Sequence, residues 1–327
     1  MPGAERGSAS GAPVPGALLG AWRIERELGR GGMGVVFLAS RADGAYAQQV
    51  AIKWLPLALA AGRASQAFRR ERQLLADLRH PHIARLVDGG TSAGGHLWFA
   101  MEYVDGPPLD RYCAEHALTT AARVRLLLPV VEAVDFAHKR LLAHRDIKPG
   151  NVLVGSDGHA MLLDFGVAAL LGERAARHAV SHGHASPEQR AGAAPAIAAD
   201  VWQLGRLLET ALLAGPQDGT VPAPPPDLAA VIARACADQP EARYVSAAAL
   251  KRELLRWLEH RPVAARPATP WHRLGLLARR HPWGMAGSAL AGLAFVAVVA
   301  GFMLRLAHQR DAAERARAQA EAINTFI

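Results

Sequence analysis

Three side chains that could act on a phosphate group lie within six residues of one another. The octapeptide "HRDIKPGN" at 144–151 contains the carboxylate of Asp146, the ammonium of Lys148 and the amide of Asn151. A carboxylate can accept or orient a hydroxyl proton, an ammonium can neutralise phosphoryl charge, and an amide oxygen can bind a metal ion. The same residue types also suit a polar turn between helices. The spacing favours a phosphoryl-transfer loop, and the polar turn is the alternative.

A glycine-rich stretch, "LGRGGMGVV" at 28–36, offers a second kind of phosphate contact. Because glycine has no Cβ, its backbone N–H group can approach phosphate oxygens closely. The order G-x-G-x-x-G also occurs in dinucleotide-binding folds, but there a helix follows the glycines. Here the strand-like "VVFLAS" follows, which favours a flap over a nucleotide. The candidate phosphate-binding glycines are Gly29, Gly31, Gly32 and Gly34.

Lys53 ends the apolar run "VAIK", nineteen residues beyond Gly34. The chain has only four lysines among its 37 basic residues, so a lysine within a strand pattern calls for an explanation. A buried ammonium needs an anionic partner, since an unpaired one is costly. Glu71, on the next predicted helix, could supply that carboxylate. The alternative for Glu71 is an ordinary exposed helix charge.

The segments around these residues predict two lobes. Alternating apolar residues indicate a small, mainly β lobe with one helix, and helical periodicity indicates a larger helical lobe with two short β pieces. We therefore expect an α+β fold with a cleft between the lobes, after a flexible leader at 1–19. Strands are predicted at 21–29, 34–41, 48–55, 96–104 and within 151–165, and helices at 65–78, 119–142 and 198–215.

Together these motifs resemble the eukaryotic-type (Hanks-type) protein kinases, and most closely the bacterial serine/threonine kinases. The resemblance runs from about residue 22 to 260 and includes "LRHPHIARL", "DFG" at 164–166 and "SPE" at 186–188. It implies the two-lobed protein kinase fold. The implied bounds are 20–260 for the kinase domain, 20–104 for its N-lobe and 105–260 for its C-lobe.

The resemblance also implies catalytic roles. Asp146 would accept or orient the substrate hydroxyl, and Lys148 would neutralise charge on the transferred group. Lys53, paired with Glu71, would contact the α- and β-phosphates. The metal ligands would be Asn151 and Asp164. The adenine site would consist of Val36, Ala51 and Leu153, the gatekeeper Met101, and the hinge from Glu102 to Val104.

Further residues match the family in architectural positions. Asp200, in "DVWQLG", resembles the helix aspartate that braces the catalytic loop. Glu188 is expected to pair with Arg243. Neither Asp200 nor the Glu188–Arg243 pair is expected to be catalytic.

Two features depart from the family pattern. Between Asp164 and Pro187 there is no threonine, and the only serines are Ser181 and Ser186. Although Arg145, the usual phosphate partner, is present, we hypothesise that activation does not need phosphorylation of this loop. After 198–215 the chain continues with "PQDGTVPAPPP" where such kinases usually have another helix, so substrate docking is expected to be weak or supplied by another element.

The C-terminal part predicts a membrane anchor. A proline-punctuated linker is expected at 261–282, followed by an uncharged stretch at 283–304. At about 1.5 Å per residue this stretch spans the ~30 Å hydrocarbon core of a bilayer, with a buried core helix as the alternative. Residues 305–327 predict the start of an extracytoplasmic helix, and a truncated chain is one explanation for its abrupt end. Small residues every four positions, Gly284, Ser288 and Gly292, suggest a homodimer as a hypothesis.

Composition limits the class of partner. The net charge of +8 would suit nucleic acid or an anionic membrane surface. The arginines are scattered along the chain, however, and no run of basic residues is interleaved with aromatic residues. This pattern argues against nucleic-acid binding. Cys113 and Cys236 lack metal-ligand spacing and are expected to be reduced, buried side chains.

The resemblance therefore implies an ATP-dependent protein serine/threonine kinase. It would be anchored by one span in the bacterial cytoplasmic membrane, with its kinase domain in the cytoplasm. The cofactors would be ATP and Mg²⁺, with Mn²⁺ as the other metal, and the substrates would be proteins that the sequence does not specify. The main alternative is a pseudokinase, an ATP-binding scaffold at the membrane. A small-molecule phosphotransferase is disfavoured, because "DIKPGN" and "SPEQ" match the protein-kinase forms of these motifs.

Overall fold

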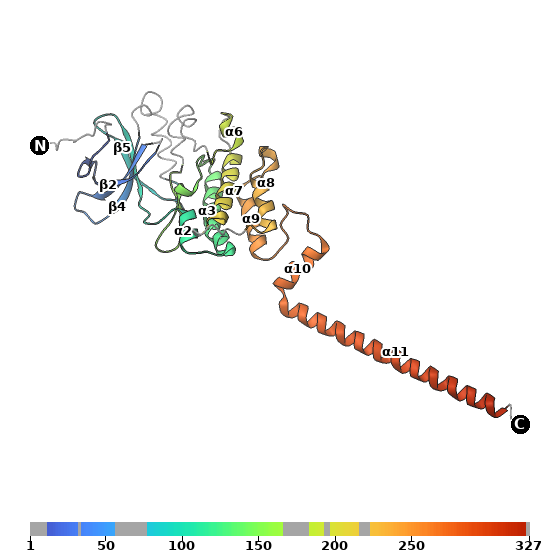
Figure 1. Ribbon diagram of the computed structural model, residues 1–327. Coiled ribbons are helices and arrows are strands. Elements are labelled where there is room, and N and C mark those ends of the chain that lie inside the picture. The colour runs from blue at the N-terminus through green and yellow to red at the C-terminus, as the bar shows by residue number, and fades with distance from the viewer. Residues whose placement is uncertain are drawn as a thin grey trace. The chain divides into compact units, whose positions relative to one another are not determined.

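The computed structural model divides the chain into two compact units (Figure 1). The first contains residues 1–258 and 263–267, and the second contains 259–262 and 268–327. The residues that the structure describes are 12–31, 34–55, 77–165, 183–192, 197–215 and 223–324.

An antiparallel six-stranded sheet forms the smaller part of the first unit, in the order β1-β2-β3-β4-β6-β5. Its strands are β1 (Leu18–Leu19), β2 (Trp22–Gly31), β3 (Gly34–Arg41), β4 (Gln49–Trp54), β5 (Leu86–Thr91) and β6 (Leu97–Glu102). The four predicted strands correspond to β2, β3, β4 and β6. The sequence missed β5, "LVDGGT", because two glycines and an aspartate interrupt the apolar alternation. The predicted helix at 65–78, which carries Glu71, lies almost entirely outside the described residues.

The alternation along β4 decides where Lys53 points. Val50 and Ile52 are fully buried in a cluster that also contains Trp22 and Phe37. Residues between them face the other side of the sheet, since side chains alternate along a strand. On that side Ala51 packs in a separate buried cluster with Phe99 and Met101. Lys53 shares this second face and is 5% exposed.

Helices dominate the larger part of the first unit, which also contains the two-stranded sheet β7-β8. Its elements are α2 (Leu109–Glu115), α3 (Thr120–His138), η2 (Pro149–Asn151), β7 (Val152–Val154), β8 (Ala160–Leu162), α6 (Pro187–Arg190), α7 (Ile197–Leu213), α8 (Pro226–Ala235), η3 (Pro240–Ala242) and α9 (Ala247–Leu258). Buried residues of α3, α7, α8 and α9 form one continuous core. Ile147, from the loop at 144–151, packs in this core.

The helix predicted at 119–142 is shorter in the structure. Thr119 is its N-cap and accepts a hydrogen bond from Ala122 N at 3.2 Å. The helix ends at His138, four residues before the predicted end. Leu141 adopts a left-handed backbone with φ of 61°, which a helix interior does not permit.

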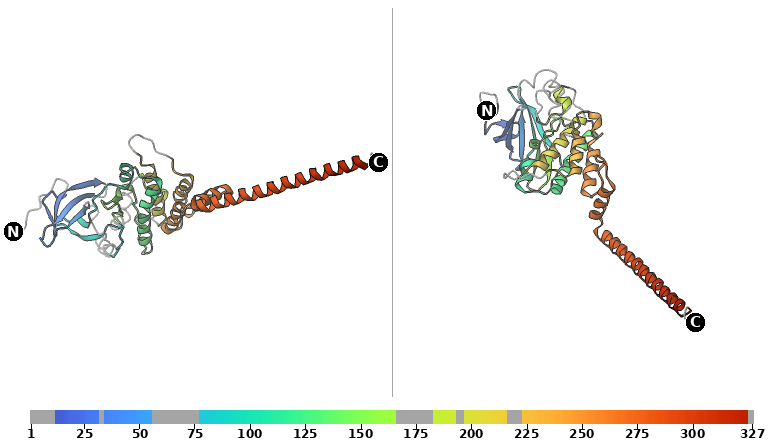
Figure 2. Two further views of the ribbon diagram at one scale, coloured as in Figure 1. Left: turned by 90° about the horizontal axis from the view of Figure 1, so that it is seen from below. Right: turned by 45° about the vertical axis from the view of Figure 1, so that its right-hand side comes forward.

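The second unit consists of α10 (Pro270–Arg280) and α11 (Pro282–Asn324) (Figure 2). Within Pro282–Arg315, α11 is long and apolar enough to cross a membrane, and its most apolar 18-residue window has a mean hydropathy of 2.2. The predicted span at 283–304 and the helix expected after it are one continuous helix here.

The segment predicted as a linker at 261–282 is partly ordered. Val263 is 3% exposed, and the N–H groups of Ala264 and Ala265 donate to Glu253 Oε2 at 2.6 and 3.0 Å. Residues 263–267 therefore belong to the first unit. Farther along, the linker region contains the helix α10.

Candidate active site

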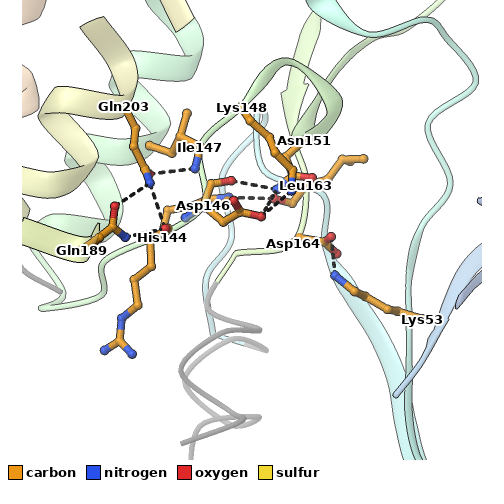
Figure 3. A network of polar contacts seen from close by, with 11 residues as sticks. Lys53, His144, Asp146, Ile147, Lys148, Asn151, Leu163, Asp164, Gln189 and Gln203 are labelled. Atoms are coloured by element: carbon orange, nitrogen blue, oxygen red, sulfur yellow. Dashed lines mark hydrogen bonds and ion pairs between the residues drawn. The ribbon is translucent and has the colours of Figure 1, made fainter. Parts of the chain in front are cut away.

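The acid, the ammonium and the amide of "HRDIKPGN" converge on one another (Figure 3). Lys148 Nζ lies 2.7 Å from Asp146 Oδ2, and Asn151 Nδ2 donates to the backbone O and Oδ2 of Asp146 at 2.8 and 3.2 Å. Asp146 and Asn151 are 6% and 8% exposed. Because the Asn151 amide nitrogen is held by Asp146, its oxygen lies on the opposite side of the amide, available as a ligand. A plain polar turn would not bury these groups together.

Helix α7 holds the backbone of this loop. Asp200, which is fully buried, accepts from the N–H groups of His144 and Arg145, both at 2.7 Å. His138 Nε2 lies 2.8 Å from Asp200 Oδ2. The predicted bracing role of Asp200 is confirmed. Two backbone donors that would otherwise be buried without partners are thereby satisfied.

Gln203, one turn after Asp200 on α7, completes this support, and the sequence interpretation missed it. Its Oε1 accepts from Ile147 N at 2.8 Å, and its Nε2 donates to Arg145 O at 2.9 Å (Figure 3). Gln189 Nε2 donates to the same carbonyl at 2.8 Å. The sequence signal that could have identified Gln203 is its position three residues after Asp200, because this spacing places the Gln203 and Asp200 side chains on one helix face.

His144 couples this loop to the strand end that carries Asp164. His144 Nδ1 accepts from Asp146 N at 3.3 Å, so Nε2 carries the proton and donates to Leu163 O at 2.8 Å. The His144 and Phe165 rings meet edge to face at 4.8 Å. Leu163 N in turn donates to Asn151 O at 2.8 Å. The loop at 144–151 and the segment at 163–165 therefore fix each other's position.

Lys53 reaches across from the sheet to Asp164, with Nζ 2.6 Å from Oδ2 (Figure 3). The two side chains are 6% and 18% exposed, so little water screens this pair. Glu71, the partner that the resemblance implies for Lys53, lies outside the described residues.

Two residues at the site have left-handed backbones. Arg145 has φ of 74° and Asp164 has φ of 56°. Such conformations are unfavourable for residues other than glycine and persist where the surrounding structure enforces them. Here the hydrogen bonds of Asp200 and Gln203 enforce the first of them. Both strained positions lie directly beside the converging polar groups.

The residues assigned to adenine line the faces of neighbouring elements. Ala51 pairs with Met101, and Val36 pairs with Lys53, across adjacent strands. Leu153 forms a bridge with Pro108, a few residues after the hinge. Gly106 allows this close approach, because a Cβ there would lie 1.8 Å from Val154 O. The hinge begins at the end of β6, where Glu102 N donates to Arg85 O at 2.9 Å.

The glycine-rich stretch forms the turn between β2 and β3. Gly31 pairs with Gly34. Gly34 has φ of 129°, and a Cβ there would lie 2.0 Å from Trp54 O, so this position requires glycine. Among the described residues, none would lie within 4 Å of a Cβ on Gly29 or Gly31. Gly32 lies outside the described residues.

Glu188 and Arg243 form the predicted pair, which is confirmed. The Arg243 guanidinium donates to both Glu188 oxygens at 2.6 and 2.7 Å and also to the carbonyls of Ala237, Ala198 and Asp238. Arg243 is 1% exposed. Burial raises the pKa of Glu188, but the hydrogen bonds from Arg243 and nearby groups outweigh it and lower the pKa overall. The pair anchors α6 to the segment before α9.

The cysteines take no part in this site. Burial raises the pKa of the Cys113 and Cys236 thiols to about 11. Both are therefore protonated at neutral pH and poor nucleophiles.

The chain is similar to known proteins. A family model described as the protein kinase domain matches residues 22–217. The serine/threonine-protein kinase PknJ of Mycobacterium tuberculosis is 35% identical over 264 residues, which cover 71% of this chain and 44% of PknJ. PknB of Mycolicibacterium smegmatis is 32% identical over 309 residues, covering 84% of this chain and 49% of PknB.

The crystal structure of the M. tuberculosis PknI kinase domain is similar in fold. It superimposes with a TM-score of 0.58 at 30% identity and covers 75% of this chain and 99% of that domain. The chain thus spans a little under half the length of PknJ and PknB, while it matches nearly all of a solved domain.

Proposed function

The chain belongs to the protein kinase family, and from this premise we propose that it transfers the γ-phosphate of ATP to serine or threonine hydroxyls of proteins. The observation that carries the proposal is the convergence of Lys148 and Asn151 on Asp146 beside the Lys53–Asp164 pair. A pseudokinase keeps the fold without needing these groups. Here every assigned group in the described residues is present.

We assign the chemistry to these side chains as follows. Asp146 orients the substrate hydroxyl and accepts its proton as the oxygen attacks the γ-phosphate. Lys148, held at 2.7 Å from Asp146, neutralises charge on the transferred group. Lys53 contacts the α- and β-phosphates of the bound nucleotide. Because the transition state is loose, catalysis depends mainly on positioning and on charge stabilisation.

The oxygen donors of the site fit a divalent cation. The Asn151 amide oxygen and the Asp164 carboxylate are hard ligands of the kind that Mg²⁺ prefers, and phosphate oxygens and water would complete the shell. The bound metal ion would neutralise charge on the β- and γ-phosphates. Mn²⁺ accepts the same ligands, so we propose Mg²⁺ with Mn²⁺ as a substitute.

We propose further that α11 anchors the kinase in the bacterial cytoplasmic membrane, with the kinase domain in the cytoplasm. Its apolar length and the bacterial relatives support this, and ATP is available on the cytoplasmic side. A homodimer through Gly284, Ser288 and Gly292 remains a hypothesis. The substrate proteins are unspecified.

Incubation of the full chain in lipid vesicles with Mg²⁺ and γ-labelled ATP tests the activity. We expect label on serine or threonine of the chain itself or of a generic basic protein, identified by phosphoamino-acid analysis. ATP binding without transfer to any acceptor would favour the pseudokinase. Transfer to a small hydroxylated molecule, but never to protein, would favour the small-molecule phosphotransferase.

Phosphatase treatment tests the hypothesis on activation. Ser181 lies outside the described residues, and Arg145 Nε is buried without a hydrogen-bond partner among the residues that are described. We expect phosphatase-treated protein to phosphorylate an added substrate without a lag and at an unchanged initial rate. A lag that disappears after preincubation with ATP, and that Ser181→Ala makes permanent, would contradict the hypothesis.

A further inference from the structure

Helix α10 has an exposed apolar face. Trp271, Leu274 and Leu277 are 81%, 43% and 48% exposed. They recur every three residues, so at about 100° per residue they share one side of the helix. Arg279, Arg280 and the half-buried Leu276 lie on the remaining arc. The helix is therefore amphipathic, with its apolar side uncovered among the described residues.

Local signals make α10 a helix separate from α11. Thr269 accepts from His272 N at 3.2 Å and caps its start, with Pro270 at the first helical position. At the other end His281 leaves the helical region, with φ of −130° and ψ of 63°, and Pro282 starts α11. Because Pro282 also begins the candidate span, only His281 separates α10 from it. If α11 crosses a bilayer, α10 must lie at the membrane–water boundary.

Charge identifies the kind of surface that α10 would meet. From residue 261 to residue 280 the chain has five arginines and no acidic residue. Beyond Leu304 it has four arginines accompanied by three acidic residues. An anionic membrane surface attracts each arginine near it, which raises partitioning roughly fivefold per charge. The complementary surface is therefore an anionic lipid headgroup layer on the N-terminal side of the span.

We propose that α10 lies in the membrane interface, with Trp271, Leu274 and Leu277 among the acyl chains and its arginines on anionic headgroups. Tryptophan and arginine favour these two depths. A second copy of the helix is a poorer occupant. An eleven-residue helix is only about 16 Å long, too short to supply the roughly 800 Å² per partner of a stable protein interface. This inference rests on the proposed membrane anchorage.

Site-directed spin labels on the full chain in vesicles test the proposal. Leu274→Cys labels the apolar face, and Leu276→Cys is the matched control, because two residues rotate the side chain by about 200°. Leu290→Cys labels the span itself. Cys113 is buried and Cys236 is partly buried, which limits labelling at those positions. Collision rates with oxygen and with a water-soluble nickel complex report depth, in phosphatidylcholine with and without phosphatidylglycerol.

We expect oxygen collisions to dominate at residue 290 in both lipids. At residue 274 they dominate in the anionic vesicles, while nickel collisions dominate at residue 276. Replacing Arg279 and Arg280 together by glutamine should reduce the membrane-inserted fraction at residue 274, by about fivefold in partitioning for each charge.

Three results would overturn the proposal. Nickel access at residue 274, with residue 290 still in the hydrocarbon, would reject the interfacial helix and leave the anchor intact. Nickel access at residue 290 would reject the anchor and the interfacial helix together. Shielding of residue 274 from both reagents, with dipolar broadening between labels, would show that the apolar face of α10 packs against a second copy of the chain.

Discussion

Replacing Asp146 by asparagine is expected to lower the rate of phosphate transfer roughly 10²–10⁴-fold, the range that loss of a positioned general base usually causes. The amide has nearly the same shape, so Asn151 and Lys148 keep an acceptor oxygen at this position. It cannot take up the hydroxyl proton, and it no longer offsets the charge of Lys148, 2.7 Å away. The adenine site is built from other elements, so ATP affinity should change little.

Initial rates of labelling and the dissociation constant for ATP, measured on the same preparations, check this prediction. Asp157→Asn is the matched control, since it makes the same change at an exposed turn where Asp157 Oδ1 accepts from His159 N at 3.0 Å. The Asp157→Asn control should transfer phosphate at the same rate as the unmodified protein. Unchanged transfer in Asp146→Asn would show that another group handles the proton, and the proposed role of Asp146 would then be wrong.

The Arg243→Met variant is expected to lose about 3–5 kcal/mol of unfolding free energy, as is usual when one partner of a buried ion pair is removed. Arg243 is 1% exposed and donates to both Glu188 oxygens. Methionine fills much of the volume but leaves the Glu188 carboxylate without its cation. The carbonyls of Ala237, Ala198 and Asp238 also lose their donor.

Urea unfolding followed by tryptophan fluorescence checks this prediction. Arg111→Met is the matched control, because Arg111 pairs with Glu115 on the surface with its side chain 70% exposed. Exposed pairs contribute about 0–1 kcal/mol, so the control should stay within that range. Adding Glu188→Gln to Arg243→Met should restore part of the lost unfolding free energy, since it removes the unpaired charge of the Glu188 carboxylate. A loss below about 1 kcal/mol in the single variant would contradict the buried-pair interpretation.

The same pair should make stability depend on pH. Burial raises the pKa of Glu188, but the hydrogen bonds from Arg243, the backbone and Ser186, together with the charge of Arg243, outweigh it and hold the pKa below its ordinary value of 4.5. Its stabilising contribution is therefore complete above the ordinary pKa and is lost as the pH falls through the lowered folded value. The stability difference between unmodified protein and Arg243→Met should shrink over that acidic range and stay constant near neutrality.

Much of the first unit could be predicted because its signals are local. The alternation over 48–55 yields β4 and places Lys53 opposite Ile52, on the face that carries Ala51. The helix predicted at 119–142 begins within one residue of the observed start, where Thr119 is the cap. The long apolar run in α11 is likewise a property of consecutive residues. Each of these features follows from the period of the backbone and needs no distant partner.

Other features depend on contacts between residues far apart in the chain. Gln189 and Gln203 meet at the carbonyl of Arg145, which is 44 and 58 positions away. No local pattern distinguishes these glutamines from exposed ones. The strand β5 was missed for a similar reason, since its pairing with β6 stabilises a segment with weak intrinsic preference for a strand. Tertiary hydrogen bonding overrides local propensity at such positions.

By itself, the sequence determined which groups the protein has for phosphate chemistry and that an uncharged helix follows them, because residue types and spacing are written along the chain. Only the tertiary structure decided that Lys53 meets Asp164 across 111 positions. It also decided that Arg145 and Asp164 adopt left-handed backbones. A strained conformation persists only when packing and hydrogen bonds from other elements offset its cost, and those elements come together only in the folded chain.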